Sequence, residues 1–257
     1  MDYCFISKAG NREINEDCIG IAEGKDCICF VVADGLGGHG KGDIASKLAT
    51  SEFQKVFEAS AGPSLEERLE KAFENAQSAI LAEQQRQNSN FQMKTTVAAV
   101  AIDHSSAICG YIGDTRVYLF FKNRITQRTV DHSVPQMLVL AREIKEKQIR
   151  HHPDRNKLLR VLGTQGDVRF DSFSTDLKKC QAILLCSDGF WELILEKEMR
   201  STLKKSSSAQ EWLERMSEIV EDQGKDKDMD NYSAIATWLR RYGECILEYR
   251  EGSSDRH

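Results

Sequence analysis

Five aspartates stand out in the sequence, and four of them lie at the edge of short apolar runs that are far apart in the chain. Asp34 follows "CICFVVA", Asp114 ends "CGYIGD" and Asp188 ends "ILLCSD". Asp230 comes just before "NYSAIATW", and Asp17 lies in "NREINEDCIG". Short runs rich in β-branched residues predict buried strands, and a single aspartate at a strand end is usually a turn residue. Antiparallel strands can bring several such ends to one rim, so the pattern favours a β structure that collects acids at one edge.

Two amphipathic helices are predicted between the first and second of these runs. Residues 42–59 place their apolar side chains on one helical face, and a second apolar stripe continues to about residue 88. The second helix begins with a capping-box spacing of Ser64 and Glu67 after Pro63. The two helices follow one another without a strand between them.

The remaining strands are clustered rather than interleaved with helices. Turn-sized gaps separate residues 95–103, 106–114 and 116–123, which predicts antiparallel hairpins. Further along come helix and loop at 133–162, a strand at 181–189, helix at 196–222 with a Ser-rich break at 206–208, and a strand at 232–240. This order predicts an α+β fold, an antiparallel sheet covered by helices.

Composition places the chain among ordinary globular proteins. It has 257 residues, a net charge of −5, and 40% hydrophobic residues, which suits one large domain or two small ones. A negative net charge predicts no general attraction to nucleic acid or anionic membranes. We expect no membrane span and no signal peptide, because no apolar run is long enough and the N-terminus has no basic region.

Cysteine spacing predicts neither disulfides nor zinc. The chain has eight cysteines and no C-x-x-C pair. Buried free thiols in a reducing, cytoplasmic environment are the expected state. The cysteines are at positions 4, 18, 27, 29, 109, 180, 186 and 245.

The glycine-rich stretch "ADGLGGHGKGD" fits two nucleotide-binding patterns in part. Gly35, Gly37 and Gly40 match G-x-G-x-x-G, while Gly35, Gly40 and Lys41 match a phosphate loop that has Gly42 in place of Ser or Thr. Both patterns need a parallel βαβ setting, which the order of elements does not predict. The acids about 20 residues further on, Glu52 and Glu58, lie inside a predicted helix.

Carboxylates brought to one rim repel each other unless a cation neutralises them. Hard divalent ions such as Mg²⁺ and Mn²⁺ prefer oxygen ligands of this kind. Two such ions about 3.5–4 Å apart would activate a water molecule and hold a phosphoryl group.

Eight motifs, in order, resemble the metal-dependent serine/threonine protein phosphatases of the PPM type (2C class), most closely the compact bacterial branch. They are "NREINED", "VVADGLGGHGKGDIAS", "TTVAAV", "GDTRVY", "DHS", "HPDRNKLLRVLG", "LLCSDGFWE" and "DNYSAIA", within about residues 1–240. The resemblance implies a four-layer α-β-β-α sandwich with two central antiparallel sheets. It implies a catalytic domain over 1–242 with a mobile flap at about 133–160, followed by a polar tail, 243–257.

The resemblance also implies a metal centre with two core Mn²⁺ or Mg²⁺ ions. Asp34 matches the carboxylate that bridges both ions, and the carbonyl of Gly35 would bind the second. Asp188 and Asp230 would bind the first ion. Asp114 would join Asp188 at a third, weaker site.

Three further residues receive roles from the resemblance. Glu16 and Asp17 would hold metal-bound waters. Arg12 matches the phosphate clamp, because a planar guanidinium can bind two phosphate oxygens at once. Arg12 and Asp34 are therefore the expected catalytic residues.

The sequence departs from some family members at the general acid. Leu36 stands where those members have a histidine; His39 follows three residues later, and the identity of the acid stays open. His132, His151 and His152 are interpreted as flap or surface residues. Cys186 lies inside a predicted strand, not in an anion-binding loop, which argues against a cysteine phosphatase.

The implied function is hydrolysis of phosphoserine and phosphothreonine in proteins by a metal-activated water. The expected partners are phosphorylated proteins, substrates of a serine/threonine kinase, and a cytoplasmic monomer is expected. One alternative is another two-metal phosphohydrolase, such as a phosphodiesterase or nuclease. The other is a catalytically weak module that binds phosphoproteins.

Overall fold

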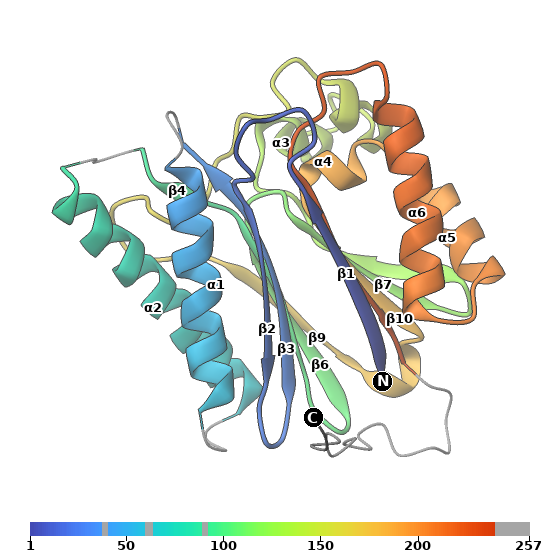
Figure 1. Ribbon diagram of the computed structural model, residues 1–257, viewed down its shortest axis with the longest axis horizontal. Helices are drawn as coiled ribbons and strands as arrows, with labels where there is room; N and C mark the ends of the chain where they lie inside the picture. Colours follow the sequence, from blue (N-terminus) through green and yellow to red (C-terminus); the bar gives the residue numbers. More distant parts are fainter. Residues whose placement is uncertain (38–40, 60–63, 89–91, 240–257) are drawn as a thin grey trace, which may run out of the picture.

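The computed structural model describes residues 1–37, 41–59, 64–88 and 92–239. Two antiparallel sheets pack face to face, and helices cover the outer face of each (Figure 1). The expected four-layer α-β-β-α sandwich is therefore confirmed. The expected tail, 243–257, lies outside the described residues.

The first sheet has five strands, which come from both ends and the middle of the chain. In spatial order they are β1 (Asp2–Lys8), β11 (Tyr232–Trp238), β10 (Ala182–Cys186), β7 (Arg116–Phe121) and β8 (Arg124–Arg128). The second sheet contains β2 (Asp17–Glu23), β3 (Ile28–Leu36), β5 (Val97–Ile102), β6 (Ser106–Ile112) and β9 (Asp171–Asp176), with the short β4 (Lys94–Thr95) paired to β3.

The two helices expected after the glycine-rich stretch cover the second sheet. They are α1 (Gly42–Glu58) and α2 (Leu65–Arg86). The Ser64 side chain accepts a hydrogen bond from the backbone of Glu67, and the Glu67 side chain accepts one from the backbone of Ser64. The predicted capping box is thus present.

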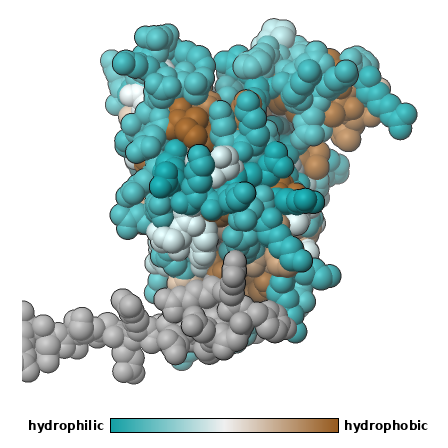
Figure 2. Space-filling model, turned by 90° about the vertical axis from the view of Figure 1, so that its right-hand side faces the viewer, coloured by the Kyte–Doolittle hydropathy of each residue, from teal (hydrophilic) through white to brown (hydrophobic). Residues whose placement is uncertain are grey.

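The outer face of the first sheet is covered by α4 (Asp188–Trp191), α5 (Glu196–Lys205) and α6 (Ala209–Gly224). The break between α5 and α6 lies at the predicted Ser-rich segment. The surface on this side is largely hydrophilic (Figure 2). The segment 133–162 contains α3 (Val134–Leu140) and the 3₁₀ helix η1 (Glu146–His151), and η2 (Leu177–Lys179) precedes β10.

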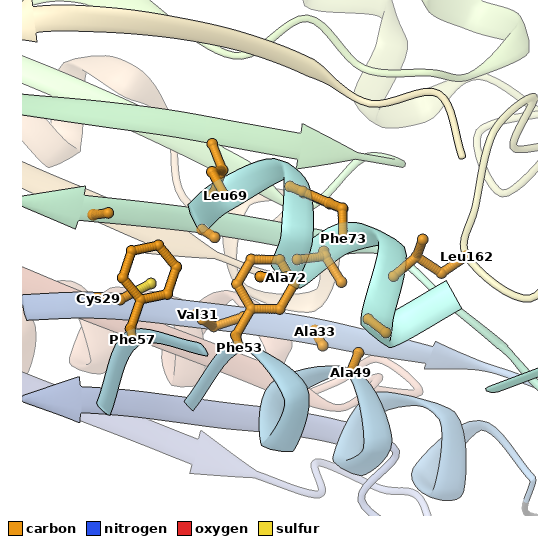
Figure 3. Close-up of a cluster of buried hydrophobic side chains, with 14 of the residues drawn as sticks. Cys29, Val31, Ala33, Ala49, Phe53, Phe57, Leu69, Ala72, Phe73 and Leu162 are labelled. Atoms are coloured by element: carbon orange, nitrogen blue, oxygen red, sulfur yellow. The ribbon is translucent and has the colours of Figure 1, made fainter. Parts of the chain in front are cut away.

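Three apolar layers hold the sandwich together. Phe53 of α1 and Phe73 of α2 meet edge to face over the second sheet, with ring centroids 5.0 Å apart (Figure 3). Phe30 and Leu185 belong to the layer between the sheets, and Trp212 lies in the layer under α5 and α6. Burial of this aromatic and aliphatic surface gives the sheets a rigid base on which polar groups can be held at the rim.

One expected hairpin is wrong. Residues 106–114 and 116–123 form β6 and β7, but β6 pairs with β5 and β9 while β7 pairs with β10 and β8. Gly113 has φ +99°, and the chain crosses from one sheet to the other at Gly113–Thr115. Both strands are apolar on both faces because each sheet is covered on both sides, so their sequences carry no signal of which neighbour they pair with.

The sequence suggested that a strand ends at Asp34, and this expectation is wrong. β3 continues to Leu36 and pairs with β4. The Asp34 carbonyl accepts hydrogen bonds from the backbone of Thr96 at 2.9 Å and from Thr95 Oγ1 at 2.8 Å. Asp34 is therefore fixed within regular sheet structure, two residues before the strand ends.

Close contact between Gly35 and Gly42 sets where α1 begins relative to β3. A Cβ atom on Gly42 would lie 2.6 Å from the Gly35 carbonyl carbon. Gly42→Ala should lower the free energy of unfolding by about 1–3 kcal/mol, as overpacking does, although alanine normally stabilises a helix. Urea unfolding measures the change, with Ser51→Ala in the same helix as the control. Unchanged or raised stability for Gly42→Ala would contradict the contact.

Candidate active site

A pocket of about 520 Å³ opens at the rim of the sandwich, and it collects nearly all the acids singled out by the sequence. Asp17 is the exception, since it is buried and does not line the pocket. The predicted residues that line the pocket are Arg12, Glu16, Asp34, Gly35, Asp114, Asp188 and Asp230. Segments separated by as many as 218 residues therefore meet at one place.

Asp17 and Asp34 are neighbours because β2 and β3 pair in a register that sets them opposite one another. Asp17 is buried, and its Oδ2 accepts a hydrogen bond of 2.8 Å from the Ser187 hydroxyl. Its Oδ1 is buried with no hydrogen-bond partner in the described chain. Burial raises the pKa of Asp17 to about 7, and nearby Asp188 and Asp230 act in the same direction, while Ser187 opposes them.

Asp188 and Asp230 come together because β10 and β11 are adjacent. Ser187 follows β10 directly, and its backbone N–H donates to the Ser233 carbonyl at 3.0 Å, so Asp188 begins α4 beside the start of β11. Burial and then Asp230 raise the pKa of Asp188, while a side-chain hydrogen bond with Asp34 lowers it.

Asn231 joins the loop before β2 to the start of β11. Its Oδ1 accepts from the backbone N–H of Glu16 at 2.8 Å, and its Nδ2 donates to the carbonyls of Ala9 and Ile14 at 2.8 and 3.0 Å. This residue therefore holds the segment that carries Arg12 and Glu16. Sequence analysis gave it no role, although it directly follows Asp230 in the "DNYSAIA" motif.

Arg12 lies over Asp230 at the mouth of the pocket. Its Nε and Nη2 approach the two Asp230 oxygens at 3.1 and 3.3 Å, and its Nη1 lies 3.3 Å from an Asp228 oxygen. The Arg12 side chain is 45% exposed. It is the only cationic side chain among the described residues that line the pocket.

The pocket carries an excess of negative charge. Burial raises the pKa of Asp34 well above its ordinary value, and four further acids add to the effect: Asp188, Asp17, Asp114 and Asp230. The pKa of Asp114 is also raised well above its usual range, first by burial and then by Asp188 and Asp131. Such a group of acids favours a bound cation.

The donor set suits a hard divalent cation. All the groups are oxygens, and Asp17 Oδ1 is buried without a partner. Within the described residues, however, no three His, Cys, Asp or Glu side chains already form a group that could hold an ion. Both oxygens of one of the acids, Asp230, are engaged by Arg12 in this structure.

Asp114 is held from two sides by residues of other elements. The indole Nε1 of Trp191 donates to the Asp114 carbonyl at 3.0 Å. His132 Nδ1 accepts from the backbone N–H of Gly113 at 3.1 Å, and the His132 backbone N–H donates to the Gly113 carbonyl at 2.8 Å. The interpretation of His132 as a flap or surface residue is therefore wrong, because it is buried beside the site.

The remaining histidine and cysteine expectations have different outcomes. His151 is exposed, His152 is partly exposed, and His39 lies outside the described residues. Burial raises the pKa of Cys186 far above its ordinary value, so this thiol cannot supply a thiolate. Cysteines in the described chain are free thiols, and Cys245 lies outside it.

The glycine-rich stretch is not set in a parallel βαβ unit. β3 is antiparallel to β2, β4 and β5. Gly35 and Gly42 serve close packing between β3 and α1, while residues 38–40 lie outside the described part of the chain. Neither nucleotide-binding pattern is supported by this setting.

Comparisons with known proteins agree with this geometry. The family model described as "Protein phosphatase 2C" matches residues 7–240. A serine/threonine phosphatase stp from Listeria welshimeri is 34% identical over 205 residues, which cover 78% of this chain and 81% of the relative. A putative protein phosphatase 2C-type from Streptococcus pyogenes is 32% identical over 220 residues, with coverage of 83% and 88%.

Solved structures share the fold over nearly the full length. The serine/threonine phosphatase Stp1 from Staphylococcus aureus superposes with a TM-score of 0.86 at 27% identity, covering 94% of this chain and 96% of that one. The catalytic domain of the phosphatase PstP, solved in complex with two manganese ions, gives a TM-score of 0.78 at 25% identity, with coverage of 91% and 96%. The chain therefore belongs to the protein phosphatase 2C family and is a metal-dependent serine/threonine protein phosphatase.

Proposed function

We propose that the rim pocket is the catalytic centre and that Asp34 is its bridging carboxylate. The observation that carries this proposal is the position of Asp34, which is paired opposite Asp17 across β2 and β3. Asp34 also lies near enough to Asp188, Asp114 and Asp230 for these acids, with Asp17, to raise its pKa. A carboxylate near four other acids would be well placed to bind two cations.

The other acids divide around Asp34. We assign Asp188 and Asp230 to the first core ion, because they lie at the adjacent ends of β10 and β11. The Gly35 carbonyl would bind the second core ion, and Asp114 with Asp188 would bind a third, outer ion. Glu16 and Asp17 would hold metal-bound waters. Bound Mn²⁺ or Mg²⁺ would lower the pKa of water and offset the carboxylate charge.

Arg12 binds the phosphoryl group of the substrate. Its fork of donors currently engages the two oxygens of Asp230, which shows the fork turned toward the acids of the pocket. A phosphoryl group offers the same two-oxygen geometry with more charge, so Arg12 can exchange one partner for the other. Arg12 thus orients the phosphorus and stabilises charge on its oxygens.

The segment 133–160 acts as a flap beside the pocket. Asn156 and Leu158 line the pocket itself. Arg155 pairs with Glu192 of the α4 end at 3.1 Å, and Arg150 pairs with Glu196 of α5 at 2.7 Å. These two ion pairs connect the flap to the segment that follows Asp188. Movement of the flap when substrate enters would therefore act on the segment that begins with Asp188.

The wider assignment is a single catalytic domain over 1–242 that acts as a cytoplasmic monomer on proteins phosphorylated by a serine/threonine kinase. A kinase is required because a phosphatase needs a phosphorylated substrate. In the described chain, no helix is long and apolar enough to span a membrane.

Turnover of a phosphothreonine peptide should require added Mn²⁺ or Mg²⁺ and stop with a chelator, because the acids of the pocket cannot generate hydroxide unaided. Phosphate release measures it, with a phosphodiester substrate run in parallel. Full turnover in excess chelator would refute the proposed centre. Faster cleavage of the diester would favour the other two-metal hydrolases, and binding without turnover would favour a phosphoprotein-binding module.

Arg12→Ala should raise KM for the phosphopeptide more than it lowers kcat, because it removes ground-state phosphate binding. Arg12→Lys should recover part of the loss, since it keeps the charge but not the fork. Arg215→Ala is a matched control: Arg215 is also paired with an acid and its side chain is 44% exposed, but it lies on α6. Equal KM values for Arg12→Ala and the control would show that Arg12 is a surface residue with no role in phosphate binding.

Asp34→Asn should raise the melting temperature of the metal-free protein by a few degrees, roughly the effect of 1 kcal/mol in a chain of this size. The reason is that burial and the neighbouring acids disfavour the ionised form of Asp34 in the folded chain, which costs stability at any pH above the pKa of the unfolded aspartate. The neutral asparagine side chain does not carry this cost. The same variant should lose the stabilisation that Mn²⁺ gives the wild type. Thermal unfolding with and without Mn²⁺ measures both.

Asp26→Asn is a control that should change the melting temperature in the opposite direction. Asp26 is paired with Arg68, which holds the pKa of Asp26 below its ordinary value, so its replacement should lower the melting temperature. If Asp34→Asn also lowered the melting temperature of the metal-free protein, charge repulsion at the rim would not be the dominant local effect.

A further inference from the structure

Trp191 occupies a position that the reaction scheme above does not use. It is the last residue of the short helix α4, which Asp188 begins, and it is 2% exposed. Its indole Nε1 donates to the Asp114 carbonyl at 3.0 Å. The Trp191 side chain therefore connects α4, which begins at Asp188, to the loop between β6 and β7 that contains Asp114.

The peptide that carries Asp114 is fixed by its backbone. Two hydrogen bonds with His132 hold Gly113, and the bond from Trp191 holds the next carbonyl. In contrast, no side chain of the described residues donates to the Asp114 carboxylate. The direction of that carboxylate is consequently set by the backbone and by the groups that hold it.

The indole is itself held in place by a buried charge network. The guanidinium carbon of Arg116 lies 3.4 Å from the centroid of the Trp191 ring. Arg116 Nε and Nη2 bind the two oxygens of buried Asp131 at 2.8 and 2.6 Å. A guanidinium held by both oxygens of one carboxylate cannot turn freely, so the ring it covers is restrained.

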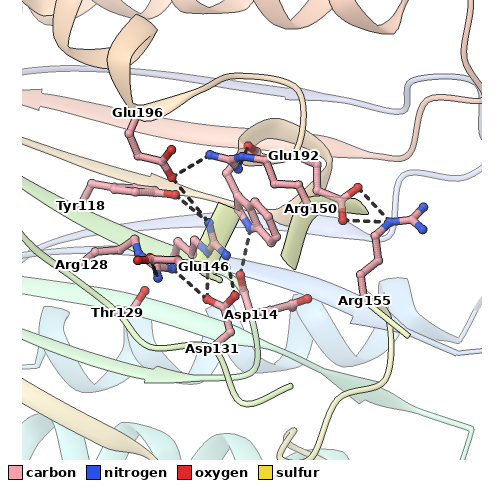
Figure 4. Close-up of polar contacts among 12 residues, drawn as sticks. Asp114, Tyr118, Arg128, Thr129, Asp131, Glu146, Arg150, Arg155, Glu192 and Glu196 are labelled. Atoms are coloured by element: carbon pink, nitrogen blue, oxygen red, sulfur yellow. Dashed lines mark hydrogen bonds and ion pairs between the residues drawn. The ribbon is translucent and has the colours of Figure 1, made fainter. Parts of the chain in front are cut away.

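A residue of the flap, Arg150, also contacts Trp191. Arg150 donates to the Trp191 carbonyl at 2.6 Å, and its guanidinium carbon lies 5.4 Å from the ring centroid. It also pairs with Glu196 (Figure 4). Trp191 is thus contacted by the flap and by the Arg116–Asp131 pair, while its N–H contacts the Asp114 peptide.

We propose that Trp191 is a positioning residue that orients Asp114 toward the outer ion and couples that orientation to the flap through Arg150. The inference depends on the proposed assignment of Asp114 to the outer ion. Partners that orient metal ligands typically contribute about 10–100-fold to metal affinity. The indole N–H is expected to act in this way through the Asp114 backbone.

Trp191→Phe tests the inference, because it keeps an aromatic ring for Arg116 and removes the N–H. Trp212→Phe is the matched control: Trp212 is also buried, and its Nε1 donates to the Met199 carbonyl at 3.1 Å, away from the pocket. Both variants should lower the melting temperature to a similar extent. In a calorimetric titration with Mn²⁺, only Trp191→Phe should weaken the outer ion, by about tenfold or more, with the core pair unchanged.

Asp114→Asn separates this inference from the assignment on which it rests. It should remove the weak phase of the Mn²⁺ titration. If the titration is unchanged, the assignment of Asp114 is wrong and the inference falls with it. If Asp114→Asn removes the weak phase but Trp191→Phe leaves it intact, the assignment stands and Trp191 has only a structural role.

A measurement on the unsubstituted protein covers the case in which Trp191→Phe does not fold. The chain has three tryptophans, so 5-fluorotryptophan gives a fluorine NMR spectrum that single Trp→Phe variants at 212 and 238 can assign. During a Mg²⁺ titration the Trp191 signal should shift with the weak phase, and Arg150→Met should reduce that shift. A Trp191 signal that does not change during the weak phase would overturn the proposal.

Discussion

Repulsion among buried carboxylates is the constraint on which the rest of the site depends. Asp34, Asp114 and Asp188 all have pKa values raised first by burial and then by other acids. Ionised together, these groups destabilise the folded chain. The same arrangement is what allows cations to bind tightly, because they remove the repulsion. Function and local instability therefore have one origin.

The sandwich can hold this arrangement because its stability comes from elsewhere. Two sheets and two layers of helices bury aromatic and aliphatic side chains on both faces of each sheet. The acids lie at one rim, outside those layers. Neutral groups then hold these residues in place: Thr95 and Thr96 bond the Asp34 carbonyl, and Asn231 bonds the backbone N–H of Glu16. The Ser187 hydroxyl bonds the side chain of Asp17.

Much of the fold was predictable because the relevant signals are local. The amphipathic stripes gave α1 and α2, and the Ser64–Glu67 spacing gave the start of α2. The strands β1, β2, β8 and β9 were not identified, since their half-exposed, mixed sequences lack a strong apolar run. The expected pairing of β6 with β7 was wrong. The sequence of a strand that is buried on both faces is apolar throughout and does not indicate which strand it pairs with.

The sequence alone determined which residues could do the chemistry: acids beside apolar strands, the glycines that follow Asp34, and an arginine near the N-terminus. Tertiary structure alone decided how they are used. It set Asp17 opposite Asp34 through strand register, brought Arg12 onto Asp230, and buried His132 and Trp191 against the Gly113–Asp114 peptide. Periodicity and motif spacing report on local backbone geometry, whereas these contacts join segments separated by tens to hundreds of residues and depend on how the two sheets pack.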